Sequence, residues 1–271
     1  FGFKTATEVA NAHHVYAALE ADVDILWIGA RSTVNPFTVQ EIAVALKGTN
    51  KPVLVKNPVN PDLALWIGAL ERLLGQDVKN LGVIHRGFSS YQKTKYRNLP
   101  NWQIALDFKH QYPNIPMFVD PSHICGRRDL LSDVTQEAFN VGYEGAMIES
   151  HCNPDAAWSD AAQQITPEVL AEMLGNLQIR NSDISGFDEE MGKHRALISD
   201  IDFQLIELLS NRMKISEKIG ALKKENNIAI FQPDRWKVIA EYASARAEES
   251  GMGKDFIEKV FKAIHEESIE V

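Results

Sequence analysis

The chain has 271 residues, 45% hydrophobic and 24% charged, which is enough apolar material for a buried core. Its formal net charge of −9 argues against nucleic-acid binding as the main role. No apolar run approaches the roughly 20 residues of a membrane span, and the N-terminus lacks a secretory signal layout. We therefore expect a cytoplasmic protein that binds neither nucleic acid nor membrane. Cys125 and Cys152 are too few for a disulfide framework.

Six short apolar runs in the first 150 residues predict strands that are buried on both faces of a parallel sheet. They recur at the spacing of one strand plus one helix, and each ends on a charged residue. The carboxyl-terminal rim of a parallel barrel is where chemistry takes place, so we expect the charged ends to gather there. The runs are Phe3–Glu8, Asp24–Arg31, Pro52–Lys56, Leu81–Arg86, Pro116–His123 and Gly145–Glu149.

This first part is short for a closed eight-stranded α/β barrel, which needs about 250 residues. About 175 residues precede a polar segment, Gly175–Phe187, within which we interpret residues 176–186 as a linker. We predict that residues 1–175 form a TIM (β/α)₈ barrel whose first two strand–helix units are missing from this sequence. A complete, open sheet of six strands is the alternative.

The predicted rim contains three candidate metal ligands. His123 and Glu149 end the fifth and sixth runs, and Asp160 lies in the following loop. One histidine with two carboxylates suits a borderline divalent ion such as manganese, iron, cobalt or zinc, and three protein ligands leave a position open for substrate. The structural alternatives are that Asp160 caps a helix beginning near Ala161 and that His123 is a satisfied core residue.

Three cations at successive strand ends, Arg31, Lys56 and Arg86, form a candidate anion clamp. Planar guanidinium groups and a point-charge ammonium are suited to phosphate and carboxylate groups. A salt bridge to Glu8 explains a single strand-end cation. Three uncompensated positive charges on one rim repel each other, so a structural role does not explain all three. The pattern therefore predicts an anionic substrate.

Six motifs follow one another in unbroken order over residues 3–175: T-x-T-E, IGAR, PVLVK, HRGF, VDPSHICGRRDL and IESHCNPDAAWSDAAQ. This series resembles the type I 3-deoxy-D-arabino-heptulosonate-7-phosphate (DAHP) synthases of the β subgroup. The resemblance implies a metal-dependent (β/α)₈ barrel that condenses phosphoenolpyruvate with erythrose 4-phosphate in the shikimate pathway. It implies binding of phosphoenolpyruvate by Ala30, Arg31, Lys56 and Arg86, metal binding by His123, Glu149 and Asp160, and catalytic roles for Lys56 and His123.

The sequence departs from that family in two places. The family's Gly-Pro-Cys segment, with a metal-ligand cysteine, and its substrate-binding Lys-Pro-Arg-Thr segment are absent, and both would precede residue 1. Asn57 stands where many relatives carry arginine. The related octulosonate-phosphate synthases, which use phosphoenolpyruvate with a pentose phosphate, are the alternative.

Beyond residue 180 the pattern becomes helical. Apolar residues at three- and four-residue steps predict one helix from Phe187 to about Asn226, followed by shorter helices at Asp234–Glu249 and Lys254–Glu267. A helix of about 40 residues is roughly 60 Å long, more than the core of this tail can cover. We expect it to pack along another long helix in a homodimer.

The cations of the long helix differ in direction. At about 100° per residue, Arg212 and Lys223 lie within roughly 20° of one face, whereas Arg195 points roughly 100° away from Arg212. Arg212 and Lys223 are thus expected to flank one dianion, and Arg195 to serve the partner's site. The alternative is a solvated basic face.

Five segments carry a second resemblance: HRALISDID, LLSNRMKIS, IGALK, FQPDRW and HEES. Through them, residues 187–271 are similar to the all-helical, AroQ-type chorismate mutases. That resemblance implies a homodimer with two shared sites that converts chorismate to prephenate without a cofactor. The implied site residues are Arg195, Arg212, Lys223, Gln232, Arg235 and Ser268, with catalytic roles for Arg195, Arg212, Lys223 and Arg235. The fusion leads us to expect feedback inhibition of the barrel by prephenate. A purely regulatory binding module is the alternative for this part.

Overall fold

In a computed structural model, the chain divides into two compact units, Phe1–Ser182 and Asp183–Val271. The structure describes residues 2–91, 93–179, 188–229 and 233–270. Residues 180–187 of the predicted linker lie outside these ranges, so its 176–186 bounds stay a prediction. Each unit has its own elements and core.

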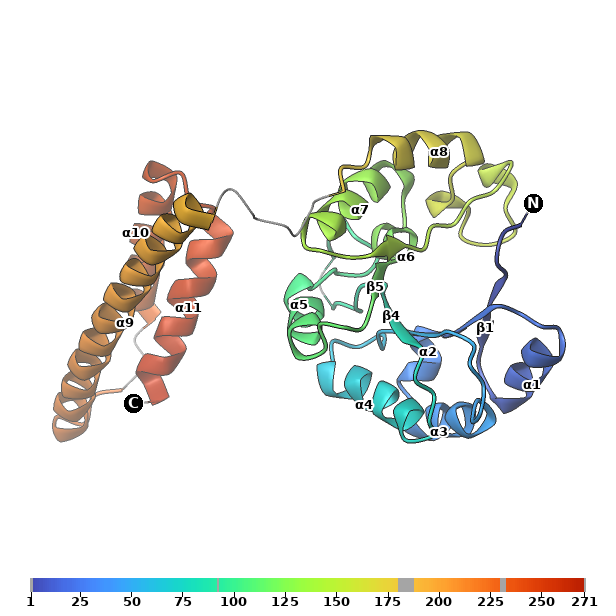
Figure 1. Ribbon diagram of the computed structural model, residues 1–271. Coiled ribbons are helices and arrows are strands. Elements are labelled where there is room, and N and C mark those ends of the chain that lie inside the picture. The colour runs from blue at the N-terminus through green and yellow to red at the C-terminus, as the bar shows by residue number, and fades with distance from the viewer. Residues whose placement is uncertain (1, 92, 180–187, 230–232, 271) are drawn as a thin grey trace. The chain divides into compact units, whose positions relative to one another are not determined.

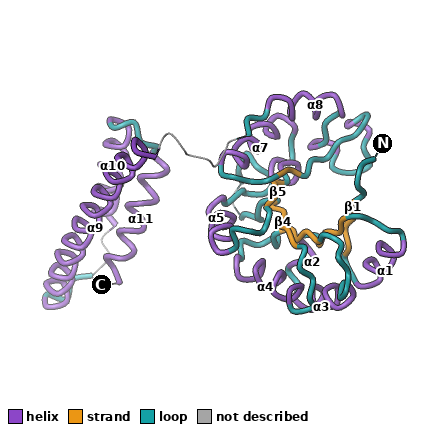
Figure 2. The backbone as a smooth tube through the Cα atoms, viewed as in Figure 1, coloured by secondary structure: helices purple, strands orange, loops and turns teal. Residues whose placement is uncertain are grey.

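The first unit is built on a parallel sheet in which each strand pairs with the next one along the chain. This confirms the predicted number, order and direction of the strands. Figure 1 shows the strands curving around a centre with helices outside them, and Figure 2 shows the same arrangement by secondary structure. The strands are β1 (Ala6–Val9), β2 (Ile25–Ile28), β3 (Val53–Lys56), β4 (Leu81–His85), β5 (Met117–Val119) and β6 (Gly145–Ala146).

The strands curve into part of a barrel, as predicted, because each is followed by a helix that covers its outer face. Side chains on both faces of the central strands are apolar, and all five residues of β4 are buried. The connecting helices are α1 (Ala12–Glu20), α2 (Ala30–Thr33), α3 (Pro36–Ala45), α4 (Leu63–Leu74), α5 (Trp102–Gln111), α6 (Pro121–Cys125), α7 (Leu131–Asn140) and α8 (Pro167–Asn176).

Three predicted strand ends are displaced by short helices or loops. Arg31 lies in α2 and His123 in α6, and Glu149 follows β6 after two further residues. At α6 the reason is local: Pro121 occupies the first helical turn, and the carboxylate of Asp120 accepts the backbone N–H of His123. The strand therefore ends before the histidine, and a helical turn presents its side chain at the rim.

The second unit consists of α9 (Asp188–Glu225), α10 (Pro233–Glu249) and α11 (Lys254–Glu270), close to the three predicted helices. Helices α10 and α11 pack together around Ala243, Ala247 and Ile257. In the described ranges, no helix is long and apolar enough to cross a membrane.

Helix α9 leaves many large apolar side chains exposed within the unit. Leu208, for example, is 65% exposed and Phe203 is 68% exposed. The others on this helix are Leu197, Ile198, Ile201, Leu205, Ile206, Leu209, Ile215, Ile219 and Leu222.

Candidate active sites

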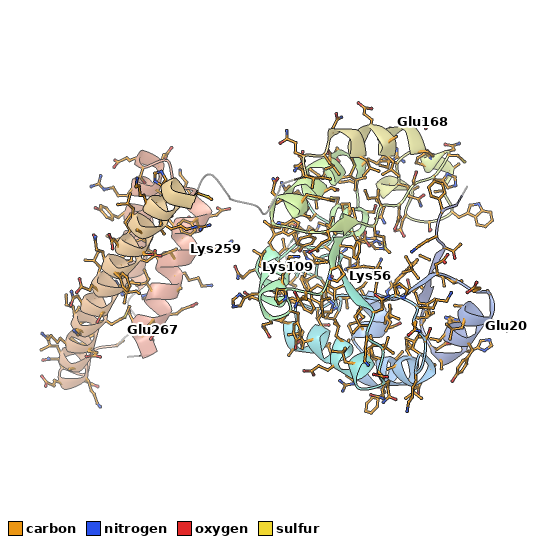
Figure 3. The ribbon with its side chains drawn as sticks, in the orientation of Figure 1. Glu20, Lys56, Lys109, Glu168, Lys259 and Glu267 are labelled. Carbon is orange, nitrogen blue, oxygen red and sulfur yellow. The ribbon has the colours of Figure 1, made fainter. Side chains whose placement is uncertain are left out.

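A cavity of about 220 Å³ opens at the carboxyl-terminal ends of the strands of the first unit. Figure 3 shows Lys56 toward the middle of this unit, whereas Glu20 and Glu168 lie at its outer edge. The cavity collects the three predicted clamp residues and two of the predicted metal ligands. It is lined by Glu8, Gly29, Ala30, Arg31, Lys56, Val59, Arg86, Arg97, His123 and Asp160.

Two of the three clamp cations are buried. Lys56 is 6% exposed and Arg86 is 8% exposed, whereas Arg31 is exposed at the cavity. Burial lowers the pKa of Arg86 from its usual value, although the charge of Asp120 opposes this shift. An arginine remains protonated at neutral pH even so. The cavity thus combines two buried positive charges with the exposed charge of Arg31.

Two asparagines hold Arg86 in place. The guanidinium donates to Oδ1 of Asn98 at 2.7 Å, and the Arg86 backbone N–H donates to Oδ1 of Asn57 at 2.7 Å. The Asn57 amide also donates to the Gly87 carbonyl at 2.8 Å. Asn57, the position that departs from many relatives, thus ties the end of β3 to the backbone beside Arg86.

Asp120 joins the clamp to the metal candidates. This carboxylate is 1% exposed, accepts from Nζ of Lys56 at 2.8 Å and lies 2.9 Å from Nδ1 of His123. Burial alone would raise the pKa of Asp120, but the hydrogen bond from His123 and the charge of Lys56 outweigh burial and hold it at about 2. Asp120 is therefore ionised at neutral pH and fixes both neighbouring side chains.

The predicted metal ligands are only partly assembled. Nδ1 of His123 lies 3.4 Å from Oε1 of Glu149. Asp160 faces the same cavity, but its carboxylate accepts from Arg97 at 2.6 Å. In the part of the chain that the structure describes, no three His, Cys, Asp or Glu side chains are grouped closely enough to hold a metal ion. Asp160 does precede the 3₁₀ turn Ala161–Gln163 as its N-cap residue, as the structural alternative expected, but its side chain makes no capping hydrogen bond.

Sequence reasoning missed Arg97, Asp120 and Gln163. Arg97 contacts both Asp160 and Gln163, and the Gln163 amide donates to Glu149 at 3.0 Å. Arg97 and Gln163 lie in loops away from strand ends, where the apolar pattern gives no signal. Asp120 was visible as the strand-end carboxylate of the segment DPSH, three residues before the candidate ligand His123.

His85, next to Arg86, is fully buried between aromatic rings. Its Nε2 is 2.7 Å from the Pro100 carbonyl and its Nδ1 is 2.9 Å from the Tyr143 hydroxyl. Burial lowers the pKa of His85 to about 4, so the ring is neutral at pH 7. Burial also raises the pKa of Tyr143. This pair lies in the buried interior next to Arg86.

In the second unit, a cavity of about 460 Å³ is lined by Arg212, Val238, Ile239, Tyr242 and Phe261. The Arg212 guanidinium donates to the Ser268 hydroxyl and to the Ile264 carbonyl, the latter at 3.4 Å. Two predicted site residues, Arg212 and Ser268, are thus brought together across α9 and α11.

Of the other predicted residues of the helical site, neither Arg195 nor Lys223 lines this cavity. Arg195 is exposed on α9, and Lys223 is half-buried further along the same helix. Arg235 lies on α10, but its side chain falls outside the described part of the structure, and Gln232 lies outside the described residues altogether.

Comparisons with known proteins agree with this division. Residues 1–184 match the DAHP synthetase I family, and residues 194–271 match the chorismate mutase type II family. Over 188 residues the chain is 27% identical to the phospho-2-dehydro-3-deoxyheptonate aldolase of Thermotoga maritima, covering 65% of this chain and 54% of that protein. The chain thus spans about half the length of this relative.

Two further curated relatives match different parts of the chain. The 2-dehydro-3-deoxyphosphooctonate aldolase of Pseudomonas putida is 28% identical over 208 residues, which are 69% of this chain and 68% of that protein. The T-protein of Haemophilus influenzae is 28% identical over 82 residues, which are 30% of this chain and 22% of that protein.

Among solved structures, a truncated form of 3-deoxy-D-arabino-heptulosonate 7-phosphate synthase from Thermotoga maritima superposes with a TM-score of 0.57 at 27% identity. The match covers 64% of each chain. Fold, motif order and family match agree over the first unit. The chain belongs to the DAHP synthetase I family and carries a chorismate mutase type II region at its C-terminal end.

Proposed function

We propose that the first unit condenses phosphoenolpyruvate with erythrose 4-phosphate to give DAHP. The observation that carries this proposal is one rim cavity in which Arg31, Lys56 and Arg86 meet His123 and Asp160. Phosphoenolpyruvate brings a phosphate and a carboxylate, and the three cations would neutralise both. Its enol carbon attacks the aldehyde, water adds at the former enol carbon, and phosphate leaves.

The residues of the chain would prepare the first substrate for this reaction. Lys56 is held by Asp120 at 2.8 Å and Arg86 by Asn98 at 2.7 Å, so both charges are oriented before an anion arrives. Ordering charges in advance lowers the cost of reorganisation when charge develops in the transition state. Lys56 thus binds the anion and remains close enough to the reacting atoms to act in catalysis.

A divalent metal ion fits the chemistry of the remaining groups. His123 and Glu149 already approach each other, and Asp160 lines the same cavity, so one nitrogen and carboxylate oxygens are at hand for manganese, iron, cobalt or zinc. Such an ion, when bound, polarises the aldehyde carbonyl as a Lewis acid. Asp120, on Nδ1 of His123, would orient that ring toward it.

A direct comparison of two aldehyde sugars identifies the second substrate. The full-length protein, supplied with manganese and phosphoenolpyruvate, is assayed for phosphate release with erythrose 4-phosphate and with arabinose 5-phosphate. We expect turnover with the four-carbon sugar. Preference for the five-carbon sugar would instead support an octulosonate-phosphate synthase.

For the second unit we propose rearrangement of chorismate to prephenate. The Arg212 guanidinium faces a cavity with an apolar wall and is anchored by Ser268, an arrangement that suits a carboxylate of a compact transition state. Arg195, Lys223, Gln232 and Arg235 are proposed to complete the site, Arg195 from the partner subunit. Chorismate binding without turnover would favour the purely regulatory module.

We also propose that α9 mediates a homodimer. Its exposed leucine and isoleucine side chains form an apolar surface too extensive for a helix in water. Leu205→Lys should shift sedimentation from dimer to monomer, whereas Phe37→Lys, at an exposed position on α3, should not. A dimer unchanged by Leu205→Lys and by a second charge at Leu208 would contradict this interface.

Feedback by prephenate is the regulatory part of the proposal. Binding to the second unit alters the first only if the two units adopt arrangements of different prephenate affinity. Condensation rate should fall with rising prephenate, and the fall should vanish in Arg212→Ala while basal condensation remains. A flat response of the intact protein would exclude this regulation.

A further inference from the structure

Gln163 is a buried neutral side chain among the charged groups of the rim. It is 1% exposed, and both ends of its amide are engaged. Its Nε2 donates to Oε2 of Glu149 at 3.0 Å, and its Oε1 accepts from Nη1 of Arg97 at 2.7 Å. An amide turned the other way would set oxygen against carboxylate and N–H against guanidinium, so the two charges determine its orientation.

These contacts, directly or through Arg97, hold one carboxylate oxygen of each of two proposed metal ligands. With Oε2 of Glu149 held by Gln163, the other oxygen, Oε1, is the one that faces Nδ1 of His123 at 3.4 Å. The same Arg97 nitrogen that donates to Gln163 also donates to Oδ1 of Asp160 at 2.6 Å. One amide therefore stands between two of the three proposed ligands.

The backbone around Gln163 is itself well anchored. Arg128 donates to the carbonyls of Ala161 and Gln164, both at 2.7 Å. Ile165 returns to the sheet edge, where its carbonyl accepts from His151 at 2.9 Å. The loop thus holds Gln163 at a fixed place between Glu149 and Arg97.

We propose that Gln163 is a positioning residue for the metal site, aiming Glu149 directly and Asp160 through Arg97. Its neutral amide separates the Glu149 carboxylate from the Arg97 guanidinium, which would otherwise pair with it and compete with the metal. Groups that orient metal ligands typically change metal affinity by about 10- to 100-fold when removed. This inference rests on the proposed metal dependence of the first unit.

The test measures manganese binding by the full chain rather than activity. Protein stripped with a chelator is titrated with Mn²⁺ in a calorimeter, comparing wild type, Gln163→Met and Gln164→Met. Methionine keeps the length of glutamine but lacks the amide. Gln164 is the matched control, since its amide donates to the Ser159 carbonyl and to neither proposed ligand.

We expect the dissociation constant for Mn²⁺ to rise about tenfold or more in Gln163→Met and to stay at the wild-type value in Gln164→Met. The Mn²⁺-induced rise in Tm of the first unit should shrink in parallel. Gln163→Asn, which keeps an amide but cannot span both partners, is the second variant should Gln163→Met fail to fold.

Equal Mn²⁺ affinity in wild type and in a folded Gln163 variant would overturn the inference while leaving the metal site intact. Absence of Mn²⁺ binding in the wild type would overturn the proposed metal dependence, and the inference with it. The thermal unfolding transition of the metal-free first unit in the same samples reports that each variant is folded.

Discussion

The two units organise charge in opposite ways. In the first, Lys56, Arg86 and Asp120 are buried at the ends of neighbouring strands, and partners within the same chain hold them in place. In the second, the Arg212 guanidinium donates to one serine hydroxyl and one backbone carbonyl. The apolar side chains of α9 remain exposed. A parallel sheet brings distant residues to one rim by itself, whereas we propose that the helical site is completed by a partner subunit.

This difference predicts that damage to one site spares the other. The largest effect is expected for His123→Ala or Glu149→Ala, each of which removes a proposed metal ligand and should abolish condensation. Chorismate turnover should persist, because the proposed rearrangement needs no metal. His110→Ala, at an exposed position on α5, is the matched control. Normal condensation rates in purified His123→Ala protein would refute the metal assignment.

Next in size is the loss of the helical clamp. Arg212→Ala should lower chorismate turnover by about 10²- to 10³-fold, since a charge aimed at a transition state carries much of the rate. Condensation should be retained. Lys254→Ala, which removes an exposed lysine paired with Glu248, serves as control and should leave both rates unchanged. Equal chorismate turnover in Arg212→Ala and wild type would favour the regulatory module.

The buried histidine makes the stability of the first unit depend on pH. Below about pH 6.5 the unfolded chain protonates His85, whereas the folded chain does so only near pH 4. The free energy of unfolding should thus fall by about 3 kcal/mol between these values. Urea titrations should show a shallower fall for His85→Gln, and the wild-type slope for His110→Gln. Parallel pH profiles for His85→Gln and wild type would contradict a neutral His85.

The smallest effect is expected at Ser268, whose hydroxyl accepts from Arg212. Ser268→Ala removes one charge-assisted hydrogen bond and should lower chorismate turnover about tenfold or less. Ser250→Ala, which removes a hydroxyl bonded only to backbone carbonyls of α10, is the control. A loss as large as that of Arg212→Ala would mean that Ser268 does more than hold the arginine.

Much of the fold was predictable because apolar runs without alternation identify strands of a parallel sheet. The same logic placed Lys56 and Arg86 on one rim. Asp160 shows where it fails: pairing with Arg97 depends on two loops far apart in sequence, and no periodicity reports such a contact. The role of Gln163 was not predicted for the same reason, because a buried neutral amide is recognised only by the groups that it contacts.

In the helical unit, the sequence predicts the helices well but not the surface that covers them. The spacing of the apolar residues predicted the bounds of α9. The geometry of a helix predicted the direction in which Arg212 points from it. What the spacing does not specify is the surface that covers Leu205 and Leu208, because that depends on a second chain. The dimer therefore stays a prediction, whereas the three helices are confirmed.

The most direct measurement of the central claim follows both reactions in one sample of the full-length protein as a chelator is added and manganese is then restored. We predict that condensation is lost with the chelator and returns with the metal, while chorismate turnover stays constant throughout. Loss of both reactions, or of neither, would contradict an account in which only the first unit holds a metal-dependent site.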